Sequence, residues 1–262
     1  GSTIAFRGIE GCVPLIHGSQ GCATYIRRYV ISHFREPLDV ASSNFSEETA
    51  VFGGGNNLKT AIANVISQYN PAVVGISTTC LSETIGDDVK RYVNEFIAEN
   101  PGIRTKILHA STPSYSGTHM EGFRSALRST VEQLTRECDT SRPRRGISIV
   151  SSLVSAEDIR YLKELCEFSG IDCTLLPDYS DTLDGESWSE YRKIPDGGTP
   201  VNRIRDMALS EGVIELGSGI KPEKSVAAYL GSEFAVPGRT MPIPVGIDLT
   251  DVFLGTIREL SG

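Results

Sequence analysis

The chain has 262 residues, of which 39% are hydrophobic and 22% charged, as is ordinary for a globular protein with self-sufficient cores. Its formal net charge of −8 disfavours nucleic acid as a partner, because Lys and Arg contacts to phosphates dominate such binding. No apolar run approaches the roughly 18 residues that a membrane helix needs, and no signal peptide opens the sequence. We therefore expect a cytoplasmic protein with neither nucleic acid nor membrane as partner.

Strand and helix patterns alternate through the first half of the chain. Apolar runs indicate strands, and apolar residues at helical spacing indicate helices. The continuous apolar run AVVGIS is typical of a buried parallel strand. In chain order, the patterns predict a strand at 12–16, a helix at 21–35, a helix at 56–69, a strand at 72–77, a helix at 89–99, a strand at 106–109 and a helix at 117–134.

A polar stretch with a proline, CDTSRPRR at 138–145, is the best linker candidate, and we expect its RPRR run to be solvated. The alternation then restarts. The second half is predicted to contain strands at 146–150, 173–176, 213–216 and 242–246, and helices at 156–168, 203–209, 221–230 and 250–260. Such alternation is typical of βαβ units. The sequence therefore predicts an α/β fold with two consecutive Rossmann-like domains, each an open parallel sheet, at 1–140 and 146–262.

Two of the six cysteines are distinguished by the turn residues around them. Cys22 lies in HGSQGC and Cys80 in STTC, each where a turn should open a helix. A helix N-terminus favours a thiolate, and thiolates on separate turns are the ligands that iron–sulfur clusters use. Cys80 also follows a predicted strand, at the edge where open parallel sheets bind ligands. The remaining cysteines are expected to be core or surface thiols: Cys12, Cys138, Cys166 and Cys173.

Several other motifs have simple structural interpretations. The glycines at 53–55 lack the ending of a phosphate loop, so we expect a tight turn into the next helix. The histidines show no zinc-site spacing, and His17 is expected to support the Gly-Ser-Gln-Gly turn by hydrogen bonds. From the residues alone, Ser114 is expected to cap a helix. Tyr25 and Phe52 are expected to pack in the core.

Together, these segments resemble one family. HGSQGC, HFREP, VFGG, TTCLSETIGDD and TPSYSGTH occur in an order similar to the β-type subunit of nitrogenase component 1, the molybdenum–iron protein. The DGG turn at 196–198 and the PVGIDLTD segment at 244–251 extend the likeness over essentially the whole chain. The resemblance implies a subunit of an ATP-dependent oxidoreductase of nitrogen fixation. Its partners would be an α-type subunit, a second β-type subunit in a heterotetramer, and the electron-donating iron protein.

The resemblance also implies roles for particular residues. The family holds an 8Fe-7S P-cluster between its α-type and β-type subunits, with cysteines from both. Cys22 and Cys80 would be ligands from the β side, and Ser114 matches a serine that ligates the oxidised cluster. Tyr25 matches an aromatic residue implicated in electron passage, and Phe52 matches a residue of the surface that docks the iron protein. The cofactor that reduces the substrate belongs to the α-type partner.

Two departures from the family pattern lead us to expect a fragment. The family's first β-side cysteine lies just upstream of an Ala-Phe segment, which here is Ala5-Phe6 near the start, and family members continue into a third α/β domain. The chain alone should therefore hold an incomplete P-cluster or none, and be inactive.

Alternative functions also stay open. A cluster-assembly scaffold subunit, with a 4Fe-4S cluster, resembles the same pattern but typically lacks the cysteine at the position of Cys80. Nitrogenase-like reductases that act on carbon–sulfur bonds would keep both Cys22 and Cys80. A plain α/β protein that binds small molecules is disfavoured, because the sequence has no nucleotide fingerprint.

Overall fold

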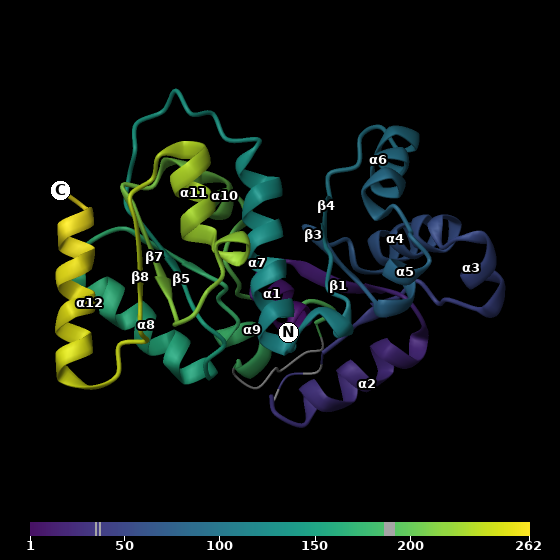
Figure 1. The fold of residues 1–262 in the computed structure, drawn as a ribbon, viewed down its shortest axis with the longest axis horizontal. Helices are drawn as coiled ribbons and strands as arrows, with labels where there is room; N and C mark the ends of the chain where they lie inside the picture. Colours follow the sequence, from purple (N-terminus) through teal and green to yellow (C-terminus); the bar gives the residue numbers. More distant parts are fainter. Residues whose placement is uncertain (35, 37, 186–191) are drawn as a thin grey trace.

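The computed structural model describes residues 1–34, 36, 38–185 and 192–262. Within these ranges the chain forms two four-stranded parallel sheets with helices around them (Figure 1), which confirms the predicted α/β fold. The predicted end of the first long helix, Arg35, lies outside the described residues, as does Pro37 of the HFREP segment. None of the helices in the described ranges is long and apolar enough to cross a membrane.

The first sheet has the strand order β2-β1-β3-β4. Its strands are β1 (Cys12–His17), β2 (Ala41–Ser42), β3 (Val73–Thr78) and β4 (Lys106–Ala110). Every residue of β1 and β3 is buried, as expected for central parallel strands that are covered on both faces. The helices of this half are α1 (Ser2–Arg7), α2 (Gln20–Ile31), α3 (Glu47–Phe52), α4 (Gly55–Tyr69), α5 (Cys80–Thr84), α6 (Val89–Glu99) and α7 (His119–Thr135).

The second sheet has the order β6-β5-β7-β8. Its strands are β5 (Ile147–Val150), β6 (Cys173–Leu176), β7 (Gly212–Leu216) and β8 (Gly238–Met241). The helix α11 packs on β7 and β8, whereas α8 packs on β6 and against α12. The helices of this half are α8 (Ala156–Ser169), α9 (Ser180–Asp184), α10 (Val201–Arg205), α11 (Val226–Phe234) and α12 (Gly246–Leu260).

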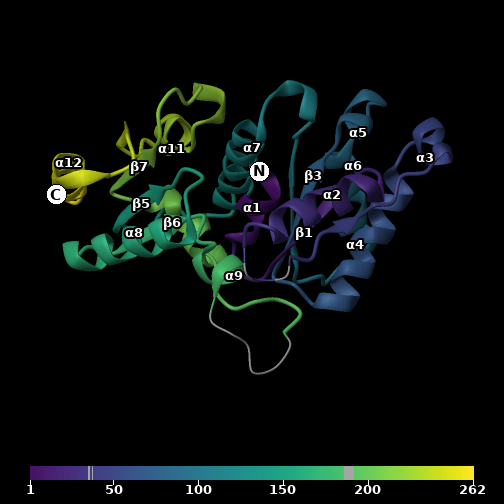
Figure 2. The same cartoon turned by 90° about the horizontal axis from the view of Figure 1, so that it is seen from below.

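The helices α1 and α7 lie between the two sheets, as both views show (Figures 1 and 2). Phe6 of α1 and Phe123 of α7 are fully buried in a hydrophobic core that also includes Ile149 and Val213 of the second sheet. A separate core lies on the other face of the first sheet, where α4 and α6 pack. The two sheets therefore share one of their cores. The division at 140–146 stays a prediction.

Most predicted elements agree with the structure to within one to three residues, but the strand at 242–246 is wrong. The edge strand β8 occupies Gly238–Met241 instead. Pro242 and Pro244 have no backbone N–H, so this segment has few donors for a sheet ladder. The predicted helices at 203–209 and 221–230 each include a 3₁₀ turn, at Asp206–Leu209 and Pro222–Lys224.

The linker at 138–145 contains neither helix nor strand, but its arginines are not simply solvated. Arg142 donates to both carboxylate oxygens of Asp206, at 2.7 and 3.2 Å. Arg144 donates to the carbonyls of Ser210 and Phe234, at 3.0 and 2.6 Å. These bonds attach the linker to the second half of the chain.

Candidate functional site

Cys22 and Cys80, the two cysteines predicted to be cluster ligands, follow neighbouring strands of the first sheet. Cys22 lies in the first turn of α2, directly after β1, and is half-buried. Cys80 is the first residue of α5, directly after β3, and is exposed. Both therefore lie at helix N-termini at the carboxyl edge of the sheet, as predicted. Ser19 supports Cys22, because its hydroxyl donates to the sulfur at 3.5 Å.

A cavity of about 350 Å³ opens at this edge, and Cys22, Cys80 and Ser114 all line it. Its wall is completed by residues that follow β4 and by the first turns of α7. Ser114 comes from the 3₁₀ turn Ser114–Ser116 and is exposed. The fold therefore brings together three residues that are 58 and 34 positions apart in the sequence (80 − 22 and 114 − 80).

The capping role expected for Ser114 is wrong. The cap of α7 is Thr118, whose hydroxyl accepts from the backbone N–H of Met120 at 3.2 Å. Glu121 completes a capping box by accepting from the N–H of Thr118 at 2.8 Å. Hydrogen bonds from Thr118 lower the pKa of Glu121 to about 2, so this carboxylate brings negative charge to the cavity wall. Ser114 is left without a capping role at this turn.

The core packing expected for Tyr25 and Phe52 is also wrong. Tyr25 is 61% exposed and lies one helical turn after Cys22 on α2. Tyr29, one further turn along, is 66% exposed. Phe52 is 83% exposed at the end of α3, beside the exposed Val51. Large exposed apolar side chains in groups are typical of surfaces that contact other proteins.

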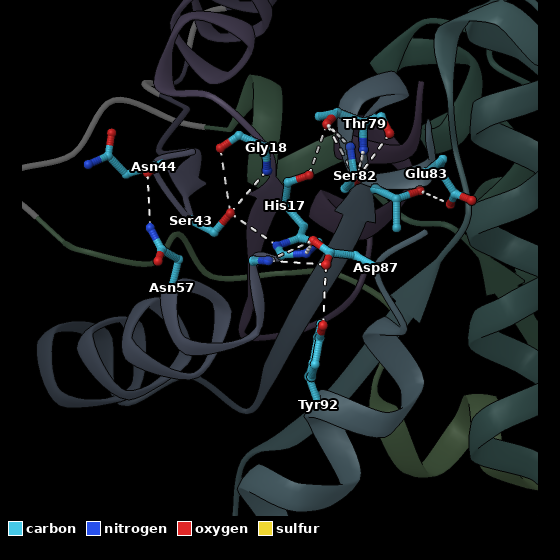
Figure 3. A network of polar contacts seen from close by, with 12 residues as sticks. His17, Gly18, Ser43, Asn44, Asn57, Thr79, Ser82, Glu83, Asp87 and Tyr92 are labelled. Carbon is cyan, nitrogen blue, oxygen red and sulfur yellow. Dashed lines mark hydrogen bonds and ion pairs between the residues drawn. The ribbon is translucent and has the colours of Figure 1, made fainter. Parts of the chain in front are cut away.

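The ring of His17 reaches the turn ahead of Cys22 only through Ser43, whose hydroxyl accepts from the N–H of Gly18 at 3.0 Å (Figure 3). The imidazole is fully buried, with Nδ1 3.1 Å from the Ser43 hydroxyl and Nε2 3.1 Å from the Asp87 carboxylate. Burial lowers the pKa of His17, although Asp87 acts in the opposite direction. A neutral ring fits its surroundings if Nε2–H donates to Asp87 and Nδ1 accepts from Ser43.

Asp87 joins this turn to the glycine turn that follows Phe52. The backbone N–H of Gly54 donates to both carboxylate oxygens of Asp87 at 3.1 Å, and the Tyr92 hydroxyl donates at 3.3 Å. A side chain at Gly54 has no room, because an added Cβ would lie 2.6 Å from Asp87. The expected tight turn is confirmed by Gly53, whose φ is +92°.

The same network reaches the turn of Cys80. The Thr79 hydroxyl donates to the carbonyl of His17 at 3.0 Å, and Thr79 caps α5 in a capping box with Ser82. Asp87 and Asp88 both precede α6, but only Asp88 caps that helix. A helix needs only one capping carboxylate. The presence of two adjacent aspartates is therefore the one feature of the sequence that could have indicated another partner for Asp87.

The described residues hold no group of three or more His, Cys, Asp or Glu side chains placed for a metal ion. Among the residues that line the cavity are the two free thiols of Cys22 and Cys80 and the hydroxyl of Ser114. Thiolates are the usual protein ligands of iron–sulfur clusters, so this donor set suits part of such a cluster. Two thiols are fewer than the four cysteine ligands that an ordinary iron–sulfur cluster uses.

Comparisons with known proteins agree with this arrangement. A family model described as nitrogenase component 1 type oxidoreductase matches residues 1–262. The nitrogenase molybdenum–iron protein beta chain of Clostridium pasteurianum is 37% identical over the whole chain and 57% of its own length. The nitrogenase iron–molybdenum cofactor biosynthesis protein NifN of Nostoc sp. is 29% identical over the whole chain and 58% of its own length.

A solved structure titled "Nitrogenase Cp1 at pH 6.5" superimposes with a TM-score of 0.93 at 36% identity, covering 100% of this chain and 56% of that one. This chain thus spans somewhat more than half the length of the relatives that it matches. The match of the family model over the entire sequence, together with the shared fold, assigns the chain to the nitrogenase component 1 type oxidoreductase family.

Proposed function

We propose that this chain is part of a β-type subunit of nitrogenase component 1. In this role it holds the P-cluster at the interface with an α-type subunit and relays electrons from the iron protein for dinitrogen reduction. The observation that carries the proposal is the single cavity lined by Cys22, Cys80 and Ser114, at the carboxyl edge of the first sheet. The similarity to the molybdenum–iron protein beta chain supports it.

The residues at the cavity have distinct parts in this function. When bound, the cluster supplies a low-potential store of electrons. Cys22 and Cys80 would hold it as thiolates, which the helix N-termini behind them favour. Ser114 would add its hydroxyl. The bonds from Thr79 to His17 and from His17 to Asp87 fix the backbone turns ahead of both cysteines.

The exposed aromatic residues extend this function to the surface. Tyr25 lies one turn beyond Cys22 on α2, which suits electron passage to or from the cluster. Phe52 projects from the end of α3 and would take part in docking the iron protein. The bond between Asp87 and Gly54 ties the turn that follows Phe52 to the network behind the cysteines. The docking surface and the cluster site would therefore share one rigid support.

Iron and sulfide analysis of the full-length complex with its α-type partner tests the proposal. We expect an eight-iron cluster at the interface, and a loss of most of its iron in Cys22→Ala and in Cys80→Ala. The matched control is Cys138→Ala, which removes a half-buried thiol in the linker and should leave the iron content unchanged. A full complement of cluster iron in Cys80→Ala would rule out this residue as a ligand.

A cluster-assembly scaffold is the second candidate, because NifN of Nostoc sp. is also similar over the whole chain. The presence of Cys80 favours the P-cluster subunit, since the scaffold typically lacks this cysteine. The same preparation separates the two functions. A 4Fe-4S cluster at the interface, in a complex that does not reduce dinitrogen when supplied with iron protein and ATP, would identify the scaffold.

A further inference from the structure

Two cysteines in the second half of the chain, outside the site described above, line one cavity. Cys166 is in the last part of α8, and Cys173 is the first residue of β6. The helix ends at Gly170, whose left-handed conformation (φ +71°) turns the chain back toward the strand. After this turn both cysteines line the same cavity, and each thiol shifts the pKa of the other. Both thiols are free.

The two thiols differ in access. Cys166 is 7% exposed and belongs to the core, whereas Cys173 is half-buried. Both line a cavity of about 520 Å³. None of the residues that line it belongs to the cavity of Cys22 and Cys80. A small molecule in the cavity would therefore meet Cys173 first, with Cys166 behind it.

The surrounding charges also distinguish the pair. Arg203 donates to the Cys173 carbonyl at 3.0 Å and forms a forked ion pair with Asp172, at 2.5 and 2.9 Å. The hydrogen bond from Cys166 lowers the pKa of Cys173, and Arg203 acts in the same direction, against burial and Asp172. The same hydrogen bond and burial raise the pKa of Cys166. Cys173 is thus favoured as the thiolate, with Cys166 as the proton donor.

We propose that Cys173 and Cys166 form a thiol–disulfide exchange site that takes low-molecular-weight disulfides. The Cys173 thiolate attacks one sulfur of the disulfide, the disulfide bond breaks, and the first small thiol leaves with a proton. Cys166 then loses its proton and attacks the Cys173 sulfur, releasing the second small thiol. The two protein thiols are oxidised to one bond, and the added disulfide is reduced to two thiols. The bond would tie the end of α8 to the start of β6.

This inference is independent of the proposed function, and Cys138 provides a control within the same chain. Its sulfur accepts a hydrogen bond from Arg142 at 3.8 Å, so it also has a guanidinium neighbour and is also half-buried. No second cysteine in the described residues is paired with it. Cys138 should therefore stop at the mixed disulfide.

The test treats the full-length protein with oxidised glutathione without oxygen, blocks free thiols with N-ethylmaleimide, and digests with trypsin. The peptide 164–192 contains both Cys166 and Cys173. We expect mass spectrometry to find this peptide two hydrogen atoms lighter and free of maleimide. The peptide of Cys138 should instead carry glutathione or maleimide. A peptide 164–192 that takes up two maleimides after this treatment would overturn the proposal.

Two variants assign the roles. Cys166→Ser should trap glutathione on Cys173 as a stable mixed disulfide, whereas Cys173→Ser should leave Cys166 unmodified until the protein is unfolded. In the unaltered protein, a brief maleimide pulse should label Cys173 more than about tenfold faster than Cys166, because the accessible thiolate is the nucleophile. This comparison needs no variant to fold. Glutathione on Cys166 in preference to Cys173, or equal labelling of both, contradicts the assigned order of attack.

Discussion

At the scale of single residues, the carboxylate of Asp87 holds the turns around the cavity together. Its side chain is 3% exposed and accepts from His17, Gly54 and Tyr92. Asp87→Asn keeps the size but removes the charge, and the new amide N–H groups would face other donors. Because hydrogen bonds to charged groups contribute about 1.5–3 kcal/mol each, we expect the free energy of unfolding to fall by about 2–3 kcal/mol. Denaturant unfolding of the full-length protein measures this change in the free energy of unfolding.

The neighbouring carboxylate is the control for this prediction. Asp88 caps α6 by accepting from the N–H of Arg91 at 3.0 Å, and it is exposed. Asn caps helices about as well as Asp, so Asp88→Asn should change the free energy of unfolding by less than about 0.5 kcal/mol. Equal effects of Asp87→Asn and Asp88→Asn would show that the buried network contributes nothing beyond a cap.

The comparison of Asp87 with the cysteines shows which residues of the candidate site the sequence could predict. Cys22 and Cys80 could be found because the turn residues that position them are adjacent in the chain. Two partners of Asp87, Gly54 and His17, are 33 and 70 residues away, so no local pattern indicates them. The placement of Cys166 and Cys173 on one cavity was not foreseen either, although they are only seven residues apart (173 − 166). It depends on the direction in which the chain turns after α8.

At the scale of elements, the short helix α5 depends on its cap. Thr79 accepts from the N–H of Ser82 and donates to the carbonyl of His17. Thr79→Val keeps the shape but removes both bonds, so we expect a loss of about 1 kcal/mol in the free energy of unfolding. If Cys80 is a cluster ligand, the loosened turn should also lower the cluster iron of the full-length complex. Unfolding and iron analysis of one preparation give both results.

A cap far from the cavity separates the two effects. Ser155 caps α8 by accepting from the N–H of Asp158 at 3.1 Å, in a capping box like that of α5. Ser155→Ala should therefore cost a similar free energy, about 1 kcal/mol, without loss of iron. If both variants lost the same amount of iron, the effect of Thr79→Val would reflect general instability and not the position of Cys80.

The length of a helix determined whether it could be predicted from the sequence. The long helices α4, α6, α7 and α8 could be predicted, because an amphipathic pattern over three or more turns is distinctive. The short helices α1, α3 and α9 were missed, since five or six residues show no clear period. The strand β8 was misplaced because its buried partners lie on one side only, which gives it a weaker apolar pattern than the central strands.

At the scale of the whole molecule, the shared core determines whether the two sheets unfold together. The buried side chains of α1 and α7 pack in one hydrophobic core with strands of both sheets. Arg7 adds a polar connection, because its guanidinium donates to the carbonyl of Thr182 at 3.1 Å and its own carbonyl accepts from the Thr182 hydroxyl at 2.7 Å. A continuous core of this kind favours one cooperative transition over two.

Paired core truncations in the full-length protein test this cooperativity. Phe96→Ala removes a ring from the core that belongs to the first sheet alone, and Leu162→Ala truncates a buried side chain of α8 beside the second sheet. Each should cost about 2–5 kcal/mol. If unfolding is cooperative, the slowest-exchanging amides of β1 and β3 and those of β5 and β7 should lose protection equally in either variant. A loss confined to the sheet that carries the substitution would instead support independent domains at 1–140 and 146–262.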